Sequence, residues 1–325
     1  MDIATMTCKD RLDYNNVLQT YGMYTYLKKM GNQVQVIDYV PSAKNKLKLN
    51  LSDNTKKKEK VLNNFIEKDM ITTFVKYKSM EELHDEPPLA DAYVITNASN
   101  RDISLGFKGL SSDKKCISYA TEEVDEKSLE VFKTTYDKVT SVFQTENEDV
   151  KRVVDPTFLL TNAEWYDFSA KSSLDIGESD YVLIYSDCIT KDMIEYAKQL
   201  AKYKNSKIYA VCDKIENRFG VNKVFNAVKP NELVSLIQNT EDVITTLDEG
   251  IKFSCIFEKD LHIFLNNEKH NDKQIEMINE YNLVNRIINY SSGILTRKTN
   301  YEEANIKIDK LREDSHEVLN EMISK

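Results

Sequence analysis

Polar side chains directly follow several apolar runs that predict strands, and these positions can carry binding chemistry. In the second half of the chain, Ser186-Asp187 and Cys212-Asp213 each come after such a run. A carboxylate and a hydroxyl at a strand end can hydrogen-bond the hydroxyls of a sugar or a nucleotide sugar. The same residue types also cap helices and form turns, so both interpretations stay open.

Three bases occupy comparable positions in the first half. Lys9, Arg11 and Arg101 lie in turns after predicted strands, from which they can reach an anionic ligand. The alternative for each is an ordinary exposed base.

The histidines and cysteines form no catalytic or metal-binding pattern. His262 lies in an apolar run, whereas His84, His270 and His316 lie in polar segments. The cysteines are Cys8, Cys116, Cys188, Cys212 and Cys255. They are far apart and form no CxxC pair, which argues against a zinc site and a disulfide framework. We expect structural or solvated histidines, mostly buried free thiols and no metal ion.

The order of elements predicts parallel sheets. Residues 3–7 indicate a strand, a helix ends at Gly31, and residues 34–37 indicate the next strand, which together form a βαβ unit. Further strands are expected at residues 92–96, 116–120, 139–143, 181–185, 207–211, 243–246 and 261–265. Helices are expected near residues 58–68 and at 190–203, 231–238 and 250–257, with a long one at the end of the chain.

These elements predict an α/β protein with two Rossmann-like parallel-sheet domains facing one another across a cleft, followed by a C-terminal helix. Pro156 suits a crossing segment, so we place the domains at residues 1–155 and 156–325. The arrangement resembles the GT-B organisation of many glycosyltransferases, in which sheets bind ligands at the carboxyl ends of their strands. This likeness concerns the fold and names no reaction.

Composition and charge narrow the function classes. A net charge of -9 argues against broad nucleic-acid binding, which needs a basic face. No apolar stretch reaches membrane-spanning length and no signal-like segment opens the sequence, so we expect a cytoplasmic protein without a transmembrane segment. The lysines of residues 44–60 can contact an anionic lipid surface peripherally, or they line a solvated helix face.

Several segments, in order, resemble the polysaccharide pyruvyl transferase family. The most specific is Asp-Pro-Thr-Phe-Leu-Leu at residues 155–160 with Trp165, similar to the family's linker and tryptophan. Residues 13–31 are similar to the family's opening turn, helix and glycine stop. Further likeness lies at residues 34–39, 232–237, 243–245, 253–254, 283–286 and 311–315. The resemblance implies transfer of pyruvyl from phosphoenolpyruvate, as co-substrate and without a cofactor, to a sugar of a cell-surface polysaccharide precursor.

Positions that carry the family's reactive residues differ in this chain. The family's Ser-Phe-His-Gly reads Leu-Asp-Glu-Gly at residues 247–250, so Glu249 replaces the histidine. Its Ser-Val-Arg reads Ser-Val-Phe at residues 141–143, which loses the cation. Its Gly-Ser-Asp-Gln turn reads Thr-Asn-Ala-Ser at residues 96–99, and Asn15 replaces a glycine of the opening turn.

The resemblance therefore implies substitute residues at the site. Glu249 and Arg11 are the candidate catalytic residues, because the transfer needs a proton donor and a cation. Glu249 can act as an acid where burial raises its pKa, and capping of its helix is the alternative. The candidate substrate-binding residues are Lys9, Asn15, Asn16, Asn97, Ser99, Arg101, Ser186, Asp187, Asp213, Thr246, Asp248 and Gly250.

Three functions stay open. The first is a pyruvyl transferase-like enzyme that uses these substitutes. The second is a catalytically inactive family member that binds a sugar, a nucleotide sugar or a partner in polysaccharide biosynthesis, which the several replaced positions favour. The third is a GT-B glycosyltransferase. The expected partner in each case is a sugar or a lipid-linked saccharide precursor.

Overall fold

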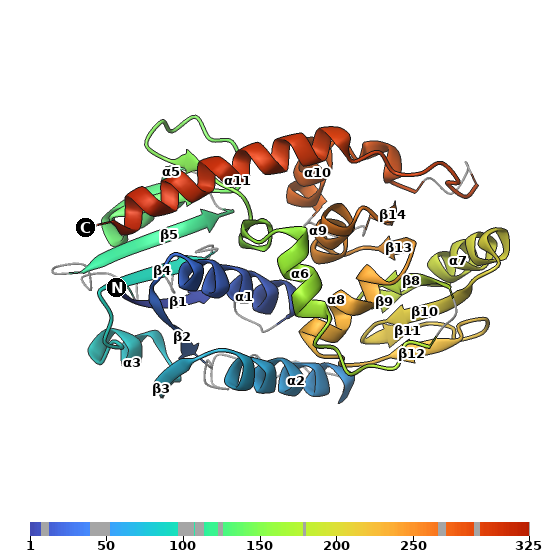
Figure 1. Ribbon diagram of the computed structural model, residues 1–325, viewed down its shortest axis with the longest axis horizontal. Helices are drawn as coiled ribbons and strands as arrows, with labels where there is room; N and C mark the ends of the chain where they lie inside the picture. The colour runs from blue at the N-terminus through green and yellow to red at the C-terminus, as the bar shows by residue number, and fades with distance from the viewer. Residues whose placement is uncertain are drawn as a thin grey trace. The chain divides into compact units, whose positions relative to one another are not determined.

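Two parallel sheets organise the computed structural model, one in each of two units (Figure 1). The structure describes residues 1–7, 13–39, 53–96, 107, 114–122, 126–177, 180–265, 271–288 and 293–324. The first unit contains Met1–Asn50, Leu62–Leu160 and Ile308–Lys325, and the second contains Leu51–Val61 and Thr161–Lys307. The expected domain limits and the expected cleft stay predictions.

The first unit has a seven-stranded sheet in the order β3-β2-β1-β4-β5-β6-β7, with parallel pairing throughout the described strands. Its strands are β1 (Asp2–Thr7), β2 (Gln33–Tyr39), β3 (Thr72–Tyr77), β4 (Ala92–Thr96), β5 (Lys115–Thr121), β6 (Lys138–Ser141) and β7 (Lys151–Arg152). The central strand β4 is buried along its whole length, as expected for a parallel strand covered on both faces.

The helices of this unit begin and end at residues with specific capping roles. They are α1 (Tyr14–Lys29), the later part of α2 (Asp53–Asp69), α3 (Met80–Asp85), α5 (Glu126–Thr135) and the 3-10 helix η2 (Pro156–Leu159). Asp13 caps α1 by accepting a hydrogen bond from the Asn16 amide at 2.8 Å. Gly22 lets α1 pack closely on η2, because a Cβ atom there would overlap the Pro156 carbonyl.

The last helix, α11 (Glu302–Ile323), packs its carboxyl-terminal part on the first unit. Ser315 Oγ accepts a hydrogen bond from the Val154 amide at 2.8 Å. The ring of His316 stacks on Tyr26 at 4.4 Å between centroids. His316 is therefore structural, in agreement with one of the two roles expected from the sequence.

The second unit has a five-stranded parallel sheet in the order β12-β10-β8-β13-β14. Strands β11 and β9 form a separate two-stranded parallel sheet. Its strands are β8 (Tyr181–Tyr185), β9 (Cys188–Ile189), β10 (Lys207–Val211), β11 (Lys214–Ile215), β12 (Lys223–Phe225), β13 (Asp242–Thr245) and β14 (Asp260–Ile263). Its helices are α6 (Asn162–Ser169), α7 (Lys191–Lys204), α8 (Pro230–Gln238), α9 (Asp248–Phe257), α10 (Asn271–Glu280) and η3 (Val284–Arg286).

The core of the second unit includes the residue that carries the most specific family likeness. Trp165 on α6 is fully buried and lies edge-on to Phe253 at 4.9 Å and to Phe168 at 5.3 Å. Aromatic pairs in this geometry add to the free energy gained from burial alone. Trp165 thus joins α6 to α9 inside this unit.

The expected fold class is confirmed: the chain is an α/β protein with two parallel sheets and a helical carboxyl terminus. None of the helices in the described ranges combines the length and the apolar character of a membrane-spanning segment. Within the same residues, no three His, Cys, Asp or Glu side chains lie close enough to hold a metal ion.

Three of the four described cysteines agree with the expectation of mostly buried thiols, and one is exposed. Cys188 is exposed because it follows the end of β8 in a short surface strand, whereas Cys116, Cys212 and Cys255 are buried. Burial raises the pKa of Cys212 to about 11 and that of Cys255 to about 12. Cys8 and His270 lie outside the described residues.

His262 on β14 is fully buried, which agrees with its expected structural role. Its ring nitrogens lie 2.8 Å from the Tyr196 hydroxyl and 3.2 Å from Asp242 Oδ1. Burial lowers the pKa of His262 below 6.5, although Asp242 opposes that shift and Arg286 adds to it.

We expect acid to destabilise the second unit through His262. Below pH 6.5, the ordinary pKa of histidine, the unfolded chain takes up a proton that the folded chain resists binding. As the pH is lowered, the free energy of unfolding should therefore decrease by at most about 1.4 kcal/mol per pH unit. The decrease should end when the pH reaches the pKa of His262 in the folded protein. His262→Gln keeps hydrogen-bonding groups and cannot titrate. The free energies of unfolding of the wild-type protein and this variant, from denaturation curves measured between about pH 7 and 5, should therefore depend differently on pH. The same pH dependence of the free energy of unfolding in both proteins would contradict a contribution of His262.

Candidate functional site

The carboxyl ends of three strands bring together the predicted site residues of the second half. Ser186 and Asp187 follow β8, Asp213 follows β10, and Thr246 follows β13. Tyr185 is in register with Val211 on one side and with Thr245 on the other, so these residues lie at one edge of the sheet. Parallel sheets bind ligands at this edge. We call this group, with the α2 residue Lys58 and the first turn of α9, the carboxyl-edge site.

A lysine from α2 sets the charge of the carboxyl-edge site. Lys58 Nζ lies 2.9 Å from Asp187 Oδ1 and 2.7 Å from Asp213 Oδ2, and its side chain is only 5% exposed. Burial lowers the pKa of Lys58, but the two carboxylates outweigh burial and raise that pKa above its ordinary value. The ammonium group is therefore charged at neutral pH.

The first turn of α2 also hydrogen-bonds Asp213. Asn54 Nδ2 donates to the Asp213 carbonyl oxygen at 2.9 Å, and the Thr55 hydroxyl donates to Asp213 Oδ2 at 3.3 Å. The Asp213 side chain is 15% exposed, whereas that of Asp187 is 64% exposed. Asp187 Oδ2 accepts no hydrogen bond from any residue that the structure describes. One oxygen of Asp187 is thus held in place and the other is open to solvent.

The burial of Lys58 corrects the interpretation of the lysine cluster as a solvated face. Lys56, Lys57 and Lys60 are exposed as expected, but Lys58 is 4% exposed. Its position on the helix gave a signal, because it is four residues before Leu62 and seven before Phe65, both buried. The lysines of residues 44–48 lie outside the described residues, and contact of this region with an anionic surface stays a prediction.

Two hydroxyl groups of the site hydrogen-bond one another. Ser186 Oγ donates to the Cys188 carbonyl oxygen at 3.0 Å and lies 2.8 Å from Thr246 Oγ1. Thr246 is therefore the donor to Ser186 in that pair. Both residues are buried, so this contact joins the ends of β8 and β13.

Glu249 lies in the first turn of α9, at the place where the resemblance predicts histidine in the family. It is 7% exposed, and its Oε1 accepts a hydrogen bond from the Tyr185 hydroxyl at 2.5 Å. A carboxylate at a helix amino terminus is stabilised by the helix dipole. The hydrogen bond and the dipole both favour the carboxylate as an acceptor. Tyr185 is a site residue that was not predicted, because it closes an apolar run that indicates only a strand.

Two neighbours define the amino end of α9. Asp248 Oδ1 accepts a hydrogen bond from Gln274 Nε2 at 2.7 Å, and the same amide donates to the Thr246 carbonyl oxygen at 3.1 Å. Gly250 leaves no room for a side chain, because a Cβ atom would overlap Thr245. The helix terminus that a ligand anion would use is therefore lined by carboxylates of the chain itself.

Lys252 is a second buried lysine that sequence analysis missed. It lies three residues after Glu249 on α9, so the two side chains share one face of the helix, and it is 5% exposed. A lysine within an apolar helical run was the available signal, since buried lysines almost always have a partner or a function.

The remaining predicted site residues belong to the first unit. Asn15 and Asn16 are buried in the first turn of α1. Near them, Thr7 Oγ1 lies 2.7 Å from Thr20 Oγ1 and 2.6 Å from Thr96 Oγ1, a hydroxyl cluster that sequence analysis did not predict. Lys9, Arg11, Asn97, Ser99 and Arg101 lie outside the described residues, and their roles stay predictions.

We expect Lys58→Met to lower the free energy of unfolding of the second unit by about 2–3 kcal/mol, because it leaves the Asp213 carboxylate without its ammonium partner. The exposure of Asp187 keeps the cost below that of a fully buried pair. Urea denaturation followed by the fluorescence of Trp165, the single tryptophan, measures this. Lys57→Met, an exposed position on the same helix, is the matched control. A loss for Lys58→Met within about 0.5 kcal/mol of the control would contradict the pairing.

Two solved structures are similar to this chain in fold. UDP-GlcNAc 2-epimerase of Methanocaldococcus jannaschii, in complex with UDP-GlcNAc and UDP, has a TM-score of 0.52 and 12% identity, covering 96% of this chain and 93% of that chain. A putative UDP-N-acetylglucosamine 2-epimerase of Listeria monocytogenes has a TM-score of 0.51 and 8% identity, covering 97% and 89%. At such identities the likeness shows the fold alone, and it agrees with the predicted GT-B-like fold class. No curated protein matches the chain.

The family comparison concerns the middle of the chain. A model described as polysaccharide pyruvyl transferase matches residues 125–246, less than half of the 325 residues. The segment contains residues 155–160 and the strand ends with Ser186, Asp187, Asp213 and Thr246. Likeness before and after it stays a prediction. Over residues 125–246, the chain matches the polysaccharide pyruvyl transferase family, as its sequence predicted.

Proposed function

We propose that the chain is a polysaccharide pyruvyl transferase-like protein that binds a saccharide or nucleotide sugar at the carboxyl-edge site without transferring pyruvyl to it. The observation that carries this proposal is the Tyr185–Glu249 hydrogen bond of 2.5 Å. Transfer from phosphoenolpyruvate needs a proton donor for the enol carbon. The Glu249 carboxylate accepts a hydrogen bond from a phenol at a helix amino terminus, so it acts there as a hydrogen-bond acceptor and does not supply the proton that the transfer needs.

The charge of the site supports a hydroxyl-bearing ligand. Both anionic groups of phosphoenolpyruvate, the phosphate and the carboxylate, are attached to its reacting carbon, so the place of reaction itself requires cations or free backbone amides. In a nucleotide sugar the pyrophosphate is remote from most of the sugar hydroxyls, which are the groups proposed to meet Asp187. Lys58 already contacts the carboxylates of Asp187 and Asp213, and taking it from them would leave the largely enclosed Asp213 carboxylate without its nearest cation. The outer oxygen of Asp187 fits a sugar hydroxyl, which can donate a hydrogen bond to it.

The proposed partner is therefore a sugar, carried on a nucleotide or on a lipid-linked precursor, in the biosynthesis of a cell-surface polysaccharide. The structurally similar epimerase of M. jannaschii was solved with UDP-GlcNAc, which makes that nucleotide sugar a rational first probe. The proposal places the protein in the cytoplasm, where such precursors are made, and includes no cofactor or metal ion.

An active pyruvyl transferase is the second candidate, and Lys252 favours it. This buried lysine lies one helical turn from Glu249 and offers a cation near the position of the replaced histidine. In that case Arg11, Lys9 and Arg101 would supply further charge for phosphoenolpyruvate. Glycosyl transfer stays a third prediction, which no described contact favours.

The test is to measure thermal stability and equilibrium binding with UDP-GlcNAc and with phosphoenolpyruvate, because a ligand of the folded state raises the melting temperature. We expect UDP-GlcNAc to bind and phosphoenolpyruvate to have no effect at millimolar concentration. Asp187→Asn should weaken UDP-GlcNAc binding roughly tenfold, as expected for a lost charged hydrogen bond. Asp192→Asn, an exposed carboxylate on α7, is the matched control.

Three other outcomes of these binding measurements would contradict the proposal. Stabilisation by phosphoenolpyruvate that Lys252→Met abolishes, together with formation of a pyruvate ketal on a sugar, would replace the proposal by the second candidate. Binding of UDP-GlcNAc that is equal in Asp187→Asn and Asp192→Asn would remove the carboxyl-edge site as the place of recognition. Binding of neither ligand would remove both candidates in the form given above.

A further inference from the structure

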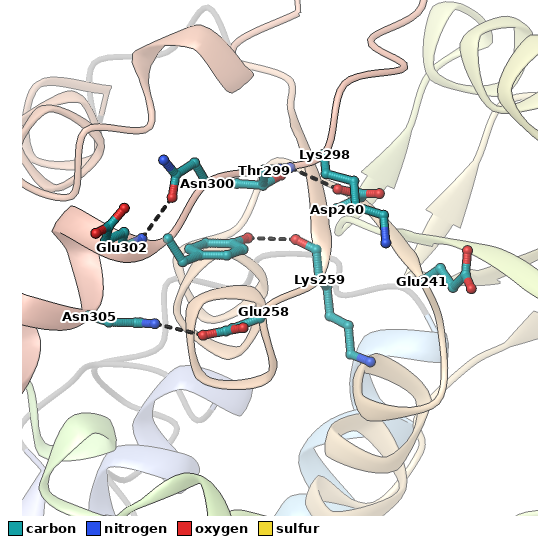
Figure 2. A pocket seen from close by; sticks show the side chains of 10 residues that line it. Glu241, Glu258, Lys259, Asp260, Lys298, Thr299, Asn300, Glu302 and Asn305 are labelled. Carbon is teal, nitrogen blue, oxygen red and sulfur yellow. Dashed lines mark hydrogen bonds between the residues drawn. The ribbon is translucent and has the colours of Figure 1, made fainter.

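A polar pocket of about 500 Å³ lies at the amino ends of β13 and β14, the edge of the second sheet opposite to the carboxyl-edge site (Figure 2). It is lined by Glu241, Glu258, Lys259, Asp260, Lys298, Thr299, Asn300, Tyr301, Glu302 and Asn305. A pocket of this size can admit a small molecule.

Most polar groups of the lining are bonded to one another. Asp260 Oδ1 accepts from the Thr299 amide at 2.9 Å, and Glu258 Oε1 accepts from Asn305 Nδ2 at 2.7 Å (Figure 2). The Tyr301 hydroxyl donates to the carbonyl oxygen of Lys259 at 2.6 Å. These bonds fix the backbone around Lys259 and leave its side chain outside the network.

The carboxylates near this edge have another lysine as their partner. Lys204 on α7 lies 3.4 Å from Asp242, 3.5 Å from Asp260 and 3.7 Å from Glu241. Burial lowers the pKa of Lys204, but these carboxylates outweigh burial and raise it above its ordinary value. Lys204 is thus held as an ammonium ion.

Lys259 has the opposite environment. Its Nζ forms no ion pair or hydrogen bond with any residue that the structure describes, and no dashed line reaches it in Figure 2. Its side chain is partly buried, and burial lowers the pKa of Lys259, with only Glu241 opposing the shift. Lys298, on the same pocket, is exposed and also has no ion-pair partner in the described ranges.

From the pocket, the fixed backbone and the missing carboxylate partner, we infer that Lys259 is a preferred site of acylation by small acyl donors such as acyl phosphates. The neutral amine nitrogen attacks the acyl carbon, a C–N bond forms, and the C–O bond to phosphate breaks with its electron pair. Inorganic phosphate leaves, and the proton lost from nitrogen passes to water. The product is an uncharged amide on Lys259.

Two features of the pocket favour this reaction over the same reaction at other lysines. The fraction of amine that is neutral rises about tenfold for each unit by which its pKa is lowered. The pocket that Lys259 lines also has room for a small donor. Lys204 lacks the first feature, because its three carboxylate partners hold its proton.

The experiment treats the folded protein with limiting acetyl phosphate at neutral pH and measures the acetylation rate of each lysine by mass spectrometry. Remaining amines are labelled with an isotopically heavy reagent after denaturation. We expect Lys259 to react roughly threefold or more faster than Lys298, the unpaired and exposed control in the same pocket, and Lys204 to react more slowly than both. The rate at Lys259 should also level off at a lower pH than the rate at Lys298.

A variant at Glu241 tests the electrostatic environment of Lys259. Glu241→Gln removes the carboxylate that opposes the shift, and Glu241 is 78% exposed, so the fold should be retained. We expect faster acetylation of Lys259 in this variant and an unchanged rate at Lys298. A wild-type rate at Lys259 no higher than at Lys298, or a Lys259 rate that falls in Glu241→Gln, would overturn the inference.

Discussion

The ammonium group of Lys58, held between Asp187 and Asp213, is the interaction on which the carboxyl-edge site depends. Two carboxylates at adjacent strand ends repel one another, and a buried cation removes that repulsion. Because the Asp213 side chain is only 15% exposed and that of Asp187 is 64% exposed, the lysine holds one carboxylate in a largely enclosed position and leaves the other facing solvent. This asymmetry creates an acceptor of fixed position at the edge where parallel sheets bind ligands.

The Tyr185–Glu249 bond completes the same electrostatic pattern. Tyr185 is the last residue of β8, directly before Ser186 and Asp187, and Glu249 lies in the first turn of α9, the helix after β13. The site thus presents oxygen acceptors at both strand ends, while Lys58 is already bound by carboxylates. Sugar hydroxyls complement such a surface, whereas an anionic group placed at this edge needs a cation such as Lys252 to offset the carboxylates. Saccharide binding and pyruvyl transfer therefore differ in which charged groups at this edge must contact the ligand.

The sequence predicted most strands because central parallel strands are apolar on both faces. Ala92–Thr96 and Tyr181–Tyr185 are buried throughout and were correctly identified. Strand β3 was missed because it lies at the sheet edge, with Phe74 and Val75 exposed, so it shows neither an apolar run nor clear alternation. The positions of Asp187 and Asp213 follow from strand ends alone. Their partner does not, because a lysine some 130 residues away in sequence becomes buried only through tertiary contact.

A double-mutant cycle between Lys58→Met and Asp213→Asn, with unfolding followed by Trp165 fluorescence, tests most directly whether this pair organises the site. The account predicts a coupling free energy of about 1.5 kcal/mol or more between the two substitutions, because each alone takes from a largely enclosed charge its nearest opposite charge. Effects that add within about 0.5 kcal/mol would show that the two side chains do not depend on one another, and would contradict it.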